Sequence, residues 1–333
     1  MNQNDEAILI DRSGRSISYL RLSITDRCDF RCTYCMPTSA RFLPREQLMT
    51  LEENLALVRV FVGMGVRKVR LTGGEPLVRQ GLASLVRNIA ALPEAPDVVM
   101  TTNGSQLGKH AEDLKAAGLS RINVSLDSLD SDNFRRITHS GKLEQVLDGL
   151  FAAKAAGFDR IKLNVVAMRG VNDHEIVQLV DFAIRHGFNI SFIEEMPFGD
   201  ASRNRQHSFM SSAEVRRQMK MAFQMVPTTE NTGGPARYFR VSGTETRIGF
   251  VSPHSHNFCD TCNRLRVAAT GDLYTCLASN STESLLPLLR ARPSDPIRLQ
   301  QAILRAIGNK PTGHDFGNND GYQAVRFMSK TGG

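Results

Sequence analysis

The chain has 333 residues and a formal net charge of +7, and hydrophobic and charged residues make up 41% and 23% of it. This is the balance of an ordinary globular protein, long enough for one large or two modest domains. No apolar run reaches the roughly 18 residues of a membrane span, and the N-terminal segment lacks the basic and apolar regions of a secretory signal. We therefore expect no membrane association and a cytoplasmic location. The positive charge is compatible with solvated surface residues, a polyanionic small molecule or nucleic acid.

The first part of the chain predicts alternating strands and helices. Apolar runs rich in β-branched residues predict strands at 18–25, 66–71, 97–102, 121–126, 161–168 and 189–195. Segments of helical period lie between them, at 51–63, 78–91, 108–118, 143–157 and 173–187. Such alternation is typical of a parallel sheet with right-handed crossovers. Six units are fewer than the eight of a closed barrel, so the predicted fold class is α/β, a partial open (β/α)6 TIM-like barrel.

After residue 200 the pattern changes, and we predict a domain boundary there, between a barrel over 1–200 and a C-terminal α+β region over 201–333. In this second region we expect a helix near 212–222, short strands at 237–241, 246–251, 264–268 and 272–275, and helices at 282–290 and 296–307. The chain ends in Thr331, Gly332 and Gly333.

All six cysteines fall into two triplets. Cys28, Cys32 and Cys35 form the pattern CxxxCxxC, and the second triplet consists of Cys259, Cys262 and Cys276. In a reducing compartment such grouping indicates metal or redox chemistry rather than disulfides. If both triplets serve one reaction, the C-terminal region has to fold back over the mouth of the barrel.

The first triplet predicts an iron–sulfur cluster. Three thiolates can hold three irons of a [4Fe–4S] cube and leave the fourth iron open, which is what catalysis at a metal needs. Between Leu20 and Thr50 there is no histidine and no fourth cysteine to complete a structural zinc site. The triplet also follows the first predicted strand directly, and α/β barrels place their active sites at the carboxyl ends of their strands.

The second triplet leaves two interpretations open. The same count of three thiolates favours a second [4Fe–4S] cluster, whose open iron could bind a nitrogen or oxygen of a substrate. His254 and His256 lie close by in the sequence, however, and could complete a zinc site instead.

The pattern CxxxCxxC after the first strand resembles the radical S-adenosylmethionine (SAM) superfamily. The resemblance implies that the open iron binds the methionine moiety of SAM, whose reductive cleavage gives a 5′-deoxyadenosyl radical. It also implies SAM contacts at Tyr34, at the Gly-Gly-Glu-Pro stretch with Gly74 and Glu75, at Ser125 and Asp127 after the fourth strand, and at Met196.

Nearly the whole chain is similar to the GTP 3′,8-cyclase family of molybdenum cofactor biosynthesis. The motifs that carry the resemblance are SITDRCDFRCTYCMP, RLTGGEPLVR, TTNG, RINVSLDSLD, MRGVND, CDTCNRLRV, KPTGHDF and the terminal Gly-Gly. The resemblance implies a lyase that converts GTP to (8S)-3′,8-cyclo-7,8-dihydroguanosine 5′-triphosphate, in which the radical takes the hydrogen atom at C3′. It further implies two [4Fe–4S] clusters, a flavodoxin- or ferredoxin-like electron donor and a downstream cyclic pyranopterin monophosphate synthase, and it is compatible with a homodimer.

GTP carries about four negative charges near neutral pH, so several cationic side chains should converge on it. By resemblance the candidates are Arg21, Arg70, Thr101, Lys162, Arg264, Leu265 and Arg266. Arg264 and Arg266 are two residues apart in a predicted strand and therefore point to one face. The family further implies that guanine binds at the open iron of the second cluster and that the terminal glycines reach the active site.

One position departs from the family pattern. Five residues before Met196 the family commonly has an arginine, and this chain has Ser191. Lys162 or Arg169 could supply the charge instead.

Two alternative functions remain open from the sequence. A radical SAM maturase that modifies a peptide and uses an auxiliary cluster would show a peptide cleft and no affinity for GTP. A metal-binding nucleic-acid protein is permitted by the charge, but the arginines lie at strand ends, without a basic helix or an aromatic stacking surface.

Overall fold

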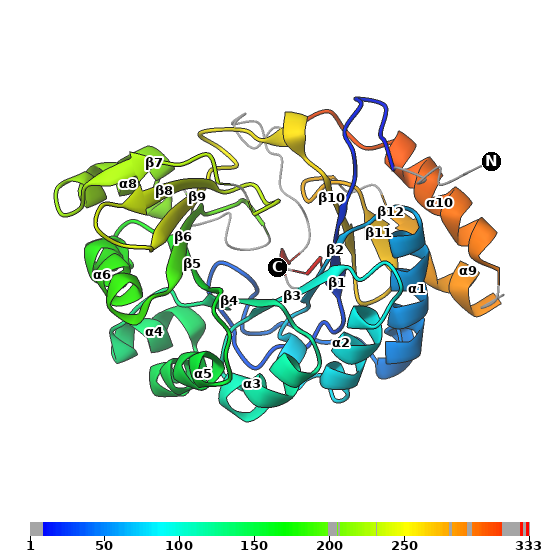
Figure 1. Ribbon diagram of the computed structural model, residues 1–333, viewed down its shortest axis with the longest axis horizontal. Coiled ribbons are helices and arrows are strands. Elements are labelled where there is room, and N and C mark those ends of the chain that lie inside the picture. The colour runs from blue at the N-terminus through cyan, green and yellow to red at the C-terminus, as the bar shows by residue number, and fades with distance from the viewer. Residues whose placement is uncertain are drawn as a thin grey trace.

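The computed structural model describes residues 9–198, 205, 207–230, 232–279, 282–291, 295–314, 327–328 and 331–332. Figure 1 shows a curved sheet whose outer face is covered by helices. No helix in this described part of the chain has the length and apolar character needed to cross a membrane.

Six parallel strands, paired in sequence order, form the centre of the sheet. They are β1 (Tyr19–Ser23), β2 (Lys68–Thr72), β3 (Asp97–Thr102), β4 (Arg121–Ser125), β5 (Ile161–Ala167) and β6 (Asn189–Glu194). The helices that connect them are α1 (Leu51–Gly63), α2 (Leu82–Ala90), α3 (Leu107–Ala116), α4 (Ser131–Thr138), α5 (Leu143–Ala155) and α6 (Ile176–His186). The predicted partial (β/α)6 barrel is thereby confirmed.

Strands from the C-terminal region extend this sheet at both of its edges. On one side β10 (Arg264–Val267) pairs in parallel with β1 and is followed by β11 (Asp272–Tyr274) and β12 (Thr282–Ser284). On the other side β9 (Arg247–Val251) pairs in parallel with β6 and is followed by β8 (Arg237–Val241) and β7 (Met225–Pro227). One open twelve-stranded sheet results, and Figure 1 shows β12 and β7 at its opposite ends.

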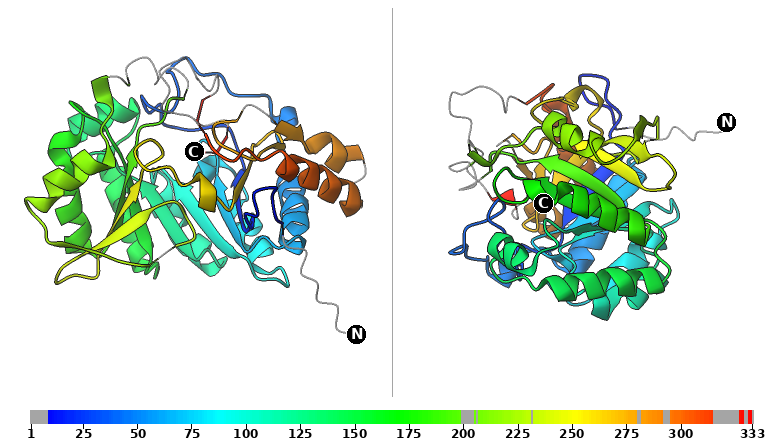
Figure 2. Two further views of the ribbon diagram at one scale, coloured as in Figure 1. Left: turned by 90° about the horizontal axis from the view of Figure 1, so that it is seen from above. Right: turned by 90° about the vertical axis from the view of Figure 1, so that its left-hand side faces the viewer.

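In the part of the chain that the structure describes, three further helices flank the two ends of the sheet. They are α8 (Ser212–Lys220), α9 (Leu286–Ala291) and α10 (Pro296–Gly308). Figure 2 shows α9 and α10 beside α1, far from α8. Arg290 of α9 binds Glu53 of α1 at 2.7 Å, and Thr50 and Glu53 form the capping box that begins α1. Through this contact the C-terminal region is fixed against the first unit of the barrel.

The alternation of side chains along the strands separates core from cavity. In β1 the side chains of Leu20 and Leu22 are fully buried in the hydrophobic core beneath the helices. Tyr19 and Arg21 alternate with them and therefore point to the concave face. Several of the side chains that point inward are polar or charged. The interior of this barrel can therefore bind a ligand and is not filled by apolar packing alone.

The structure differs from the sequence predictions in four places. Helix α4 was not predicted, because its only buried apolar side chains are Phe134 and Ile137. The helix predicted over 282–290 is wrong in its first part, since Thr282–Ser284 pairs with β11 as a strand. The short edge strand β7 was missed. Helix α2 begins at Leu82 rather than at 78, because Pro76–Val78 forms a separate 3-10 turn and Gly81 has a φ of +80°.

Candidate active site

Both cysteine triplets line one cavity of about 320 Å³ on the concave side of the sheet, which we call the barrel cavity. Cys28, Cys32 and Cys35 come from the loop that follows β1. Cys259, Cys262 and Cys276 come from the segments around β10 and β11, and the pairing of β10 with β1 brings them to the same mouth. The C-terminal region therefore does fold back over the barrel.

The first triplet lies in surroundings that disfavour free thiolates. Burial raises the pKa of Cys28 to about 12, with a further contribution from the Glu75 carboxylate, and burial raises the pKa of Cys32 well above its usual value. All three thiols are free of disulfides. The backbone N–H of Phe30 donates to Cys28 Sγ at 3.4 Å, and Asn103 Nδ2 lies 3.8 Å from the same sulfur. Thiolates here need added positive charge, which the irons of a cluster supply, so these residues fit a [4Fe–4S] group.

The Gly-Gly-Glu stretch after β2 packs directly against the cysteine loop. Gly74 N–H donates to the carbonyl of Thr25 at 2.8 Å, and a Cβ on Gly74 would lie 2.3 Å from the carbonyl oxygen of Arg27. Only glycine fits there. Glu75 is fully buried and does not line the barrel cavity, since its carboxylate accepts hydrogen bonds from Leu77 N–H, Thr102 Oγ1 and Asn103 N–H. With these three hydrogen bonds, Glu75 holds the loop in place.

Tyr34 and Asp127 join the cysteine loop to the end of β4. The hydroxyl of Tyr34 donates to Asp127 Oδ2 at 2.7 Å, and Val166 N–H donates to Asp127 Oδ1 at 2.8 Å. Burial raises the pKa of Asp127 to about 6, although both hydrogen bonds lower it. Ser125, Met196 and Gly74 also line the barrel cavity, so five of the six candidate SAM residues face it.

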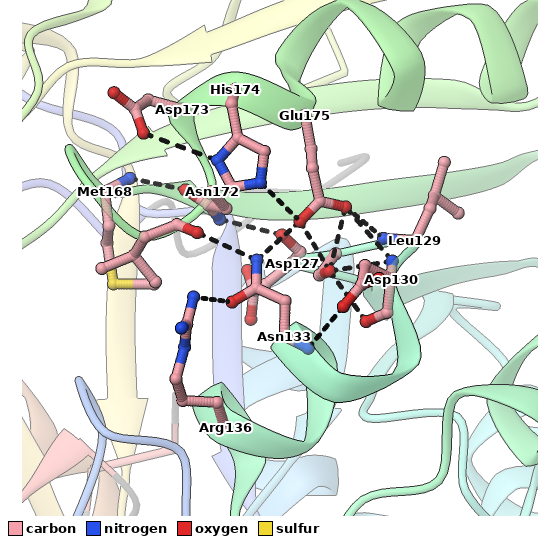
Figure 3. Close-up of polar contacts among 12 residues, drawn as sticks. Asp127, Leu129, Asp130, Asn133, Arg136, Met168, Asn172, Asp173, His174 and Glu175 are labelled. Carbon is pink, nitrogen blue, oxygen red and sulfur yellow. Dashed lines mark hydrogen bonds and ion pairs between the residues drawn. The ribbon is translucent and has the colours of Figure 1, made fainter.

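A buried polar network holds Asp127 in place (Figure 3). Asn172 Nδ2 donates to the backbone carbonyls of Asp127 and Val166, both at 2.9 Å, and its Oδ1 accepts from Met168 N–H. The carboxylate of Glu175 accepts from Leu129 N–H at 2.7 Å and from Asn133 Nδ2 at 2.6 Å. The segments MRGVND and SLDSLD thus bind each other, which sequence reasoning did not predict.

A row of cations forms one wall of the barrel cavity. Arg21 is the register partner of Arg70 on β2 and of Arg266 on β10. The other cations that line the cavity are Lys162 and Arg264, and the candidate Thr101 lies beside them. Burial and neighbouring guanidinium groups together lower the pKa of Arg21 to a net value of about 10 and that of Arg266 well below its usual value. Cations crowded in this way favour a bound polyanion.

Two tyrosines that the sequence analysis did not single out hold these cations. Arg70 Nε contacts the hydroxyl of Tyr19, and Arg70 also donates to Thr101 Oγ1 at 3.0 Å. Lys162 Nζ donates to the hydroxyl of Tyr238 at 3.3 Å. Burial raises the pKa of Tyr19, but Arg70 and Arg21 lower it to a net value of about 7. Tyr19 could have been found, because it precedes Arg21 by two residues on the same strand.

Besides Glu75, three positions considered for the binding of GTP lie away from the barrel cavity. Leu265 is fully buried in the core, on the face of β10 opposite to Arg264. Ser191 is fully buried, and its Oγ would be 2.5 Å from a Cβ added to Gly249. Arg169 pairs with Glu214 at 2.6 Å on the surface. Of the two cations suggested to compensate for Ser191, only Lys162 faces the cavity.

Polar side chains also surround the sulfurs of the second triplet. Cys259 Sγ lies 2.9 Å from His314 Nδ1, and Cys262 Sγ lies 3.6 Å from Lys310 Nζ and 3.8 Å from Arg264 Nη2. Burial raises the pKa of Cys262, but Arg264 and Lys310 lower it to a net value of about 7. The N–H groups of Lys310 and Arg264 suit the negative sulfurs of a cluster, whereas His314 Nε2 donates to the carbonyl of Pro253 at 3.0 Å. Sequence reasoning missed the contacts of His314 and Lys310, although both lie in KPTGHDF; the end of that motif is outside the described residues.

The zinc alternative finds no support in the geometry. The ring of His254 packs edge-on against Phe209, with 5.4 Å between the ring centroids, and His256 is exposed. Within the described ranges, no three His, Cys, Asp or Glu side chains are grouped so as to hold a single metal ion.

Near the end of the chain, Gly332 contacts two arginines of the barrel cavity. The carbonyl of Gly332 accepts from Arg21 Nη2 at 3.1 Å and from Arg266 Nη1 at 3.3 Å. Thr331 is 1% exposed, and Figure 1 shows this segment on the concave side of the sheet. Gly333, the last residue of the predicted tail, lies outside the described residues.

Comparisons with known proteins agree with this geometry. The Radical SAM superfamily model matches residues 22–183, and the Molybdenum Cofactor Synthesis C model matches residues 188–316. Curated proteins named GTP 3′,8-cyclase from Ectopseudomonas mendocina (strain ymp) and Marinobacter nauticus are each 52% identical over 326 residues, 98% of this chain and 98% of the relative.

Among solved structures, Streptococcus suis SuiB bound to S-adenosylmethionine has a similar fold, with a TM-score of 0.64 and 17% identity over 86% of this chain and 68% of SuiB. SuiB bound to its precursor peptide SuiA gives a TM-score of 0.63 at 16% identity, over 94% of this chain and 76% of SuiB. At this identity the likeness concerns the fold alone. From its curated relatives, the chain belongs to the GTP 3′,8-cyclase family of the radical SAM superfamily.

Proposed function

We propose that this chain converts GTP to (8S)-3′,8-cyclo-7,8-dihydroguanosine 5′-triphosphate, the first step of molybdenum cofactor biosynthesis. The observation that carries the proposal is that two cysteine triplets and five cations line one cavity. The relatives named GTP 3′,8-cyclase, at 52% identity over almost the whole chain, support the choice of substrate and reaction.

The first triplet would hold a [4Fe–4S] cluster, and Cys259, Cys262 and Cys276 would hold a second one. When bound, the first cluster supplies the electron that splits SAM into methionine and the 5′-deoxyadenosyl radical that takes the hydrogen atom from C3′ of GTP. Tyr34 and Asp127, with Ser125 and Met196, hold SAM at the carboxyl end of the barrel.

The cationic wall orients the substrate. Arg21, Arg70 and Arg266 form one row across three neighbouring strands, and Lys162 and Arg264 stand beside it. Guanidinium groups in such a row bind phosphate oxygens in fixed directions, so that C3′ faces SAM and C8 stays within reach of C3′. Burial excludes water from the reacting atoms. Guanine binds beside the second triplet, and the tail at Gly332 closes the wall between Arg21 and Arg266.

Other parts of the proposal come from the chemistry of the reaction and from the family. Electrons come from a flavodoxin- or ferredoxin-like donor, and the product passes to cyclic pyranopterin monophosphate synthase. We place the enzyme in the cytoplasm, where thiols stay reduced, and a homodimer is compatible with the proposal.

The same observations give less support to the two alternative functions, a peptide-modifying radical SAM maturase and a nucleic-acid-binding protein. The likeness to the peptide-bound SuiB is one of fold at 16% identity, whereas the relatives at 52% carry the cyclase name. Nucleic-acid binding needs cations on an accessible surface, but Arg70 and Arg266 face the interior of the barrel.

A turnover experiment tests the proposal. The protein is purified and its clusters are reconstituted without oxygen, then SAM and a reductant are added with GTP, ATP or no nucleotide. We expect 5′-deoxyadenosine and a cyclised nucleotide with GTP only, and loss of both in Cys28→Ala and in Cys259→Ala. Formation of 5′-deoxyadenosine with GTP unchanged would overturn the choice of GTP as substrate. The cleavage of SAM to a radical would still be supported.

A further inference from the structure

Lys310 is a buried cation beside the second cysteine triplet. It follows the C-terminal end of α10, where its backbone N–H donates to the carbonyl of Ile307 at 2.9 Å. The residue is 6% exposed. Its ammonium group lies 3.6 Å from Cys262 Sγ and donates to the backbone carbonyls of Arg264, at 2.9 Å, and Thr275. A lysine this deeply buried is uncommon unless an anion accompanies it.

The two carbonyls that Lys310 binds belong to the segments that carry the cysteines. Arg264 is the first residue of β10, two residues after Cys262, and Thr275 directly precedes Cys276. One ammonium group therefore links the segments of two cysteines of the same triplet.

The charge of Lys310 has no carboxylate partner among the described residues. Nearby Arg15 shows the contrast, because its buried guanidinium is paired with Asp11 at 2.6 Å. The ammonium group of Lys310 lies instead 3.6 Å from the sulfur of Cys262, and one of the carbonyls that it binds belongs to Thr275, beside Cys276. A buried cation without a counter-charge is costly, so this site favours an anionic group held by the two cysteines.

We infer that Lys310 is the positioning residue that compensates the charge of the second cluster and thereby raises its reduction potential. This inference rests on the proposed function, since it requires that cluster. Three thiolates and a [4Fe–4S] core carry net negative charge, and reduction adds one more negative charge. A fixed cation in hydrogen-bond reach of a ligating sulfur stabilises the reduced form more than the oxidised form.

The test uses the full chain with Cys28, Cys32 and Cys35 replaced by alanine, so that only the second cluster can form. Iron and sulfide content are measured, and the reduction potential is determined by a titration followed by electron paramagnetic resonance. The variants are Lys310→Met, Lys310→Gln and Lys310→Arg in this background. Lys109→Met, an exposed lysine on α3, removes the same charge far from the site and is the matched control.

We expect Lys310→Met and Lys310→Gln to make the potential more negative by at least a tenfold change in the reduction equilibrium, about 59 mV for one electron. Lys310→Arg and Lys109→Met should stay close to the parent. If the neutral variants lose the cluster altogether, retention of iron in Lys310→Arg supports charge compensation, and loss of iron in Lys310→Arg as well overturns it.

Two further outcomes separate the inference from the proposed function. An intact cluster with an unchanged reduction potential in both neutral variants would refute the role of Lys310. The assignment of the second cluster would then still hold. A parent chain that binds no iron would remove the second cluster from the proposed function, and the role of Lys310 with it.

Discussion

The hydroxyl of Tyr34 donates a hydrogen bond to Asp127 at 2.7 Å, and this contact joins the loop of the first cysteine triplet to the carboxyl end of β4. Tyr34 directly precedes Cys35, so the position of the third thiol depends on the position of β4. A second bond, from Val166 N–H, fixes the other oxygen of Asp127. The SAM side of the barrel cavity is therefore preorganised by three neighbouring segments of the barrel.

Loss of this hydrogen bond should weaken SAM binding. We expect Tyr34→Phe to reduce the affinity for SAM by about 1–2 kcal/mol, because Asp127 would lose a donor in a buried place. Asp127→Asn should have a smaller effect than Asp127→Ala, since asparagine keeps an acceptor for Val166 N–H. Calorimetric titration with SAM under anaerobic conditions measures this, and equal affinities for all four proteins would refute the assignment.

The tail glycine should be intolerant of a side chain. A Cβ on Gly332 would lie 2.5 Å from Thr72 Oγ1, and the φ of this residue is +76°. We expect Gly332→Ala to displace the tail from Arg21 and Arg266 and to lower GTP turnover at least about tenfold, the effect of some 1.4 kcal/mol. Gly170→Ala is the matched control, because Gly170 has a φ of +69° but nothing within 4 Å of its Cβ position. Equal losses in both variants would show that backbone strain, not contact with the cationic wall, limits activity.

Tyr19 should make the stability of the protein depend on pH in the alkaline range. Its folded pKa of about 7 lies below the ordinary value of 10.0, because the charges of Arg70 and Arg21 outweigh the effect of burial. Between these values the unfolded chain binds more protons than the folded one, so the free energy of unfolding rises with pH from about 7 to about 10. Thermal unfolding at a series of pH values should show this rise in the parent and a flatter profile in Tyr19→Phe. Parallel profiles would contradict the lowered pKa.

The network around Asn172 should contribute mainly to the stability of the folded protein rather than to catalysis. Asn172 is fully buried and makes three hydrogen bonds to the backbone at Met168, Val166 and Asp127. We expect Asn172→Ala to destabilise the protein by about 2–5 kcal/mol, because buried backbone groups lose their partners. Exposed Asn88 on α2 provides the control Asn88→Ala, which should change the melting temperature little. A melting temperature of Asn172→Ala close to that of the control would show that water replaces the side chain.

The sequence was most informative where chemistry and local pattern coincide. The CxxxCxxC loop follows a strand that is apolar on one face, and in a parallel sheet such loops meet at one edge. The alternation of Arg264, Leu265 and Arg266 likewise puts the two arginines on the cavity face and the leucine in the core.

Other features depend on contacts between distant segments, and the local pattern does not contain them. The pairing of β10 with β1 and of β9 with β6 joins the C-terminal region to both edges of the barrel. Helix α4 has a polar sequence and is held by Asp130, whose side chain accepts from Asn133 N–H. The sequence analysis assigned no role to Lys310, and its burial beside Cys262 follows only from where α10 ends.

The transfer of a hydrogen atom from C3′ of GTP is the central claim, and isotope labelling tests it most directly. GTP with deuterium at C3′ is given to the anaerobically reconstituted protein with SAM and a reductant, and 5′-deoxyadenosine is examined by mass spectrometry. The account predicts that deuterium appears in 5′-deoxyadenosine and that the cyclised nucleotide forms alongside it. Unlabelled 5′-deoxyadenosine together with unchanged GTP would contradict it.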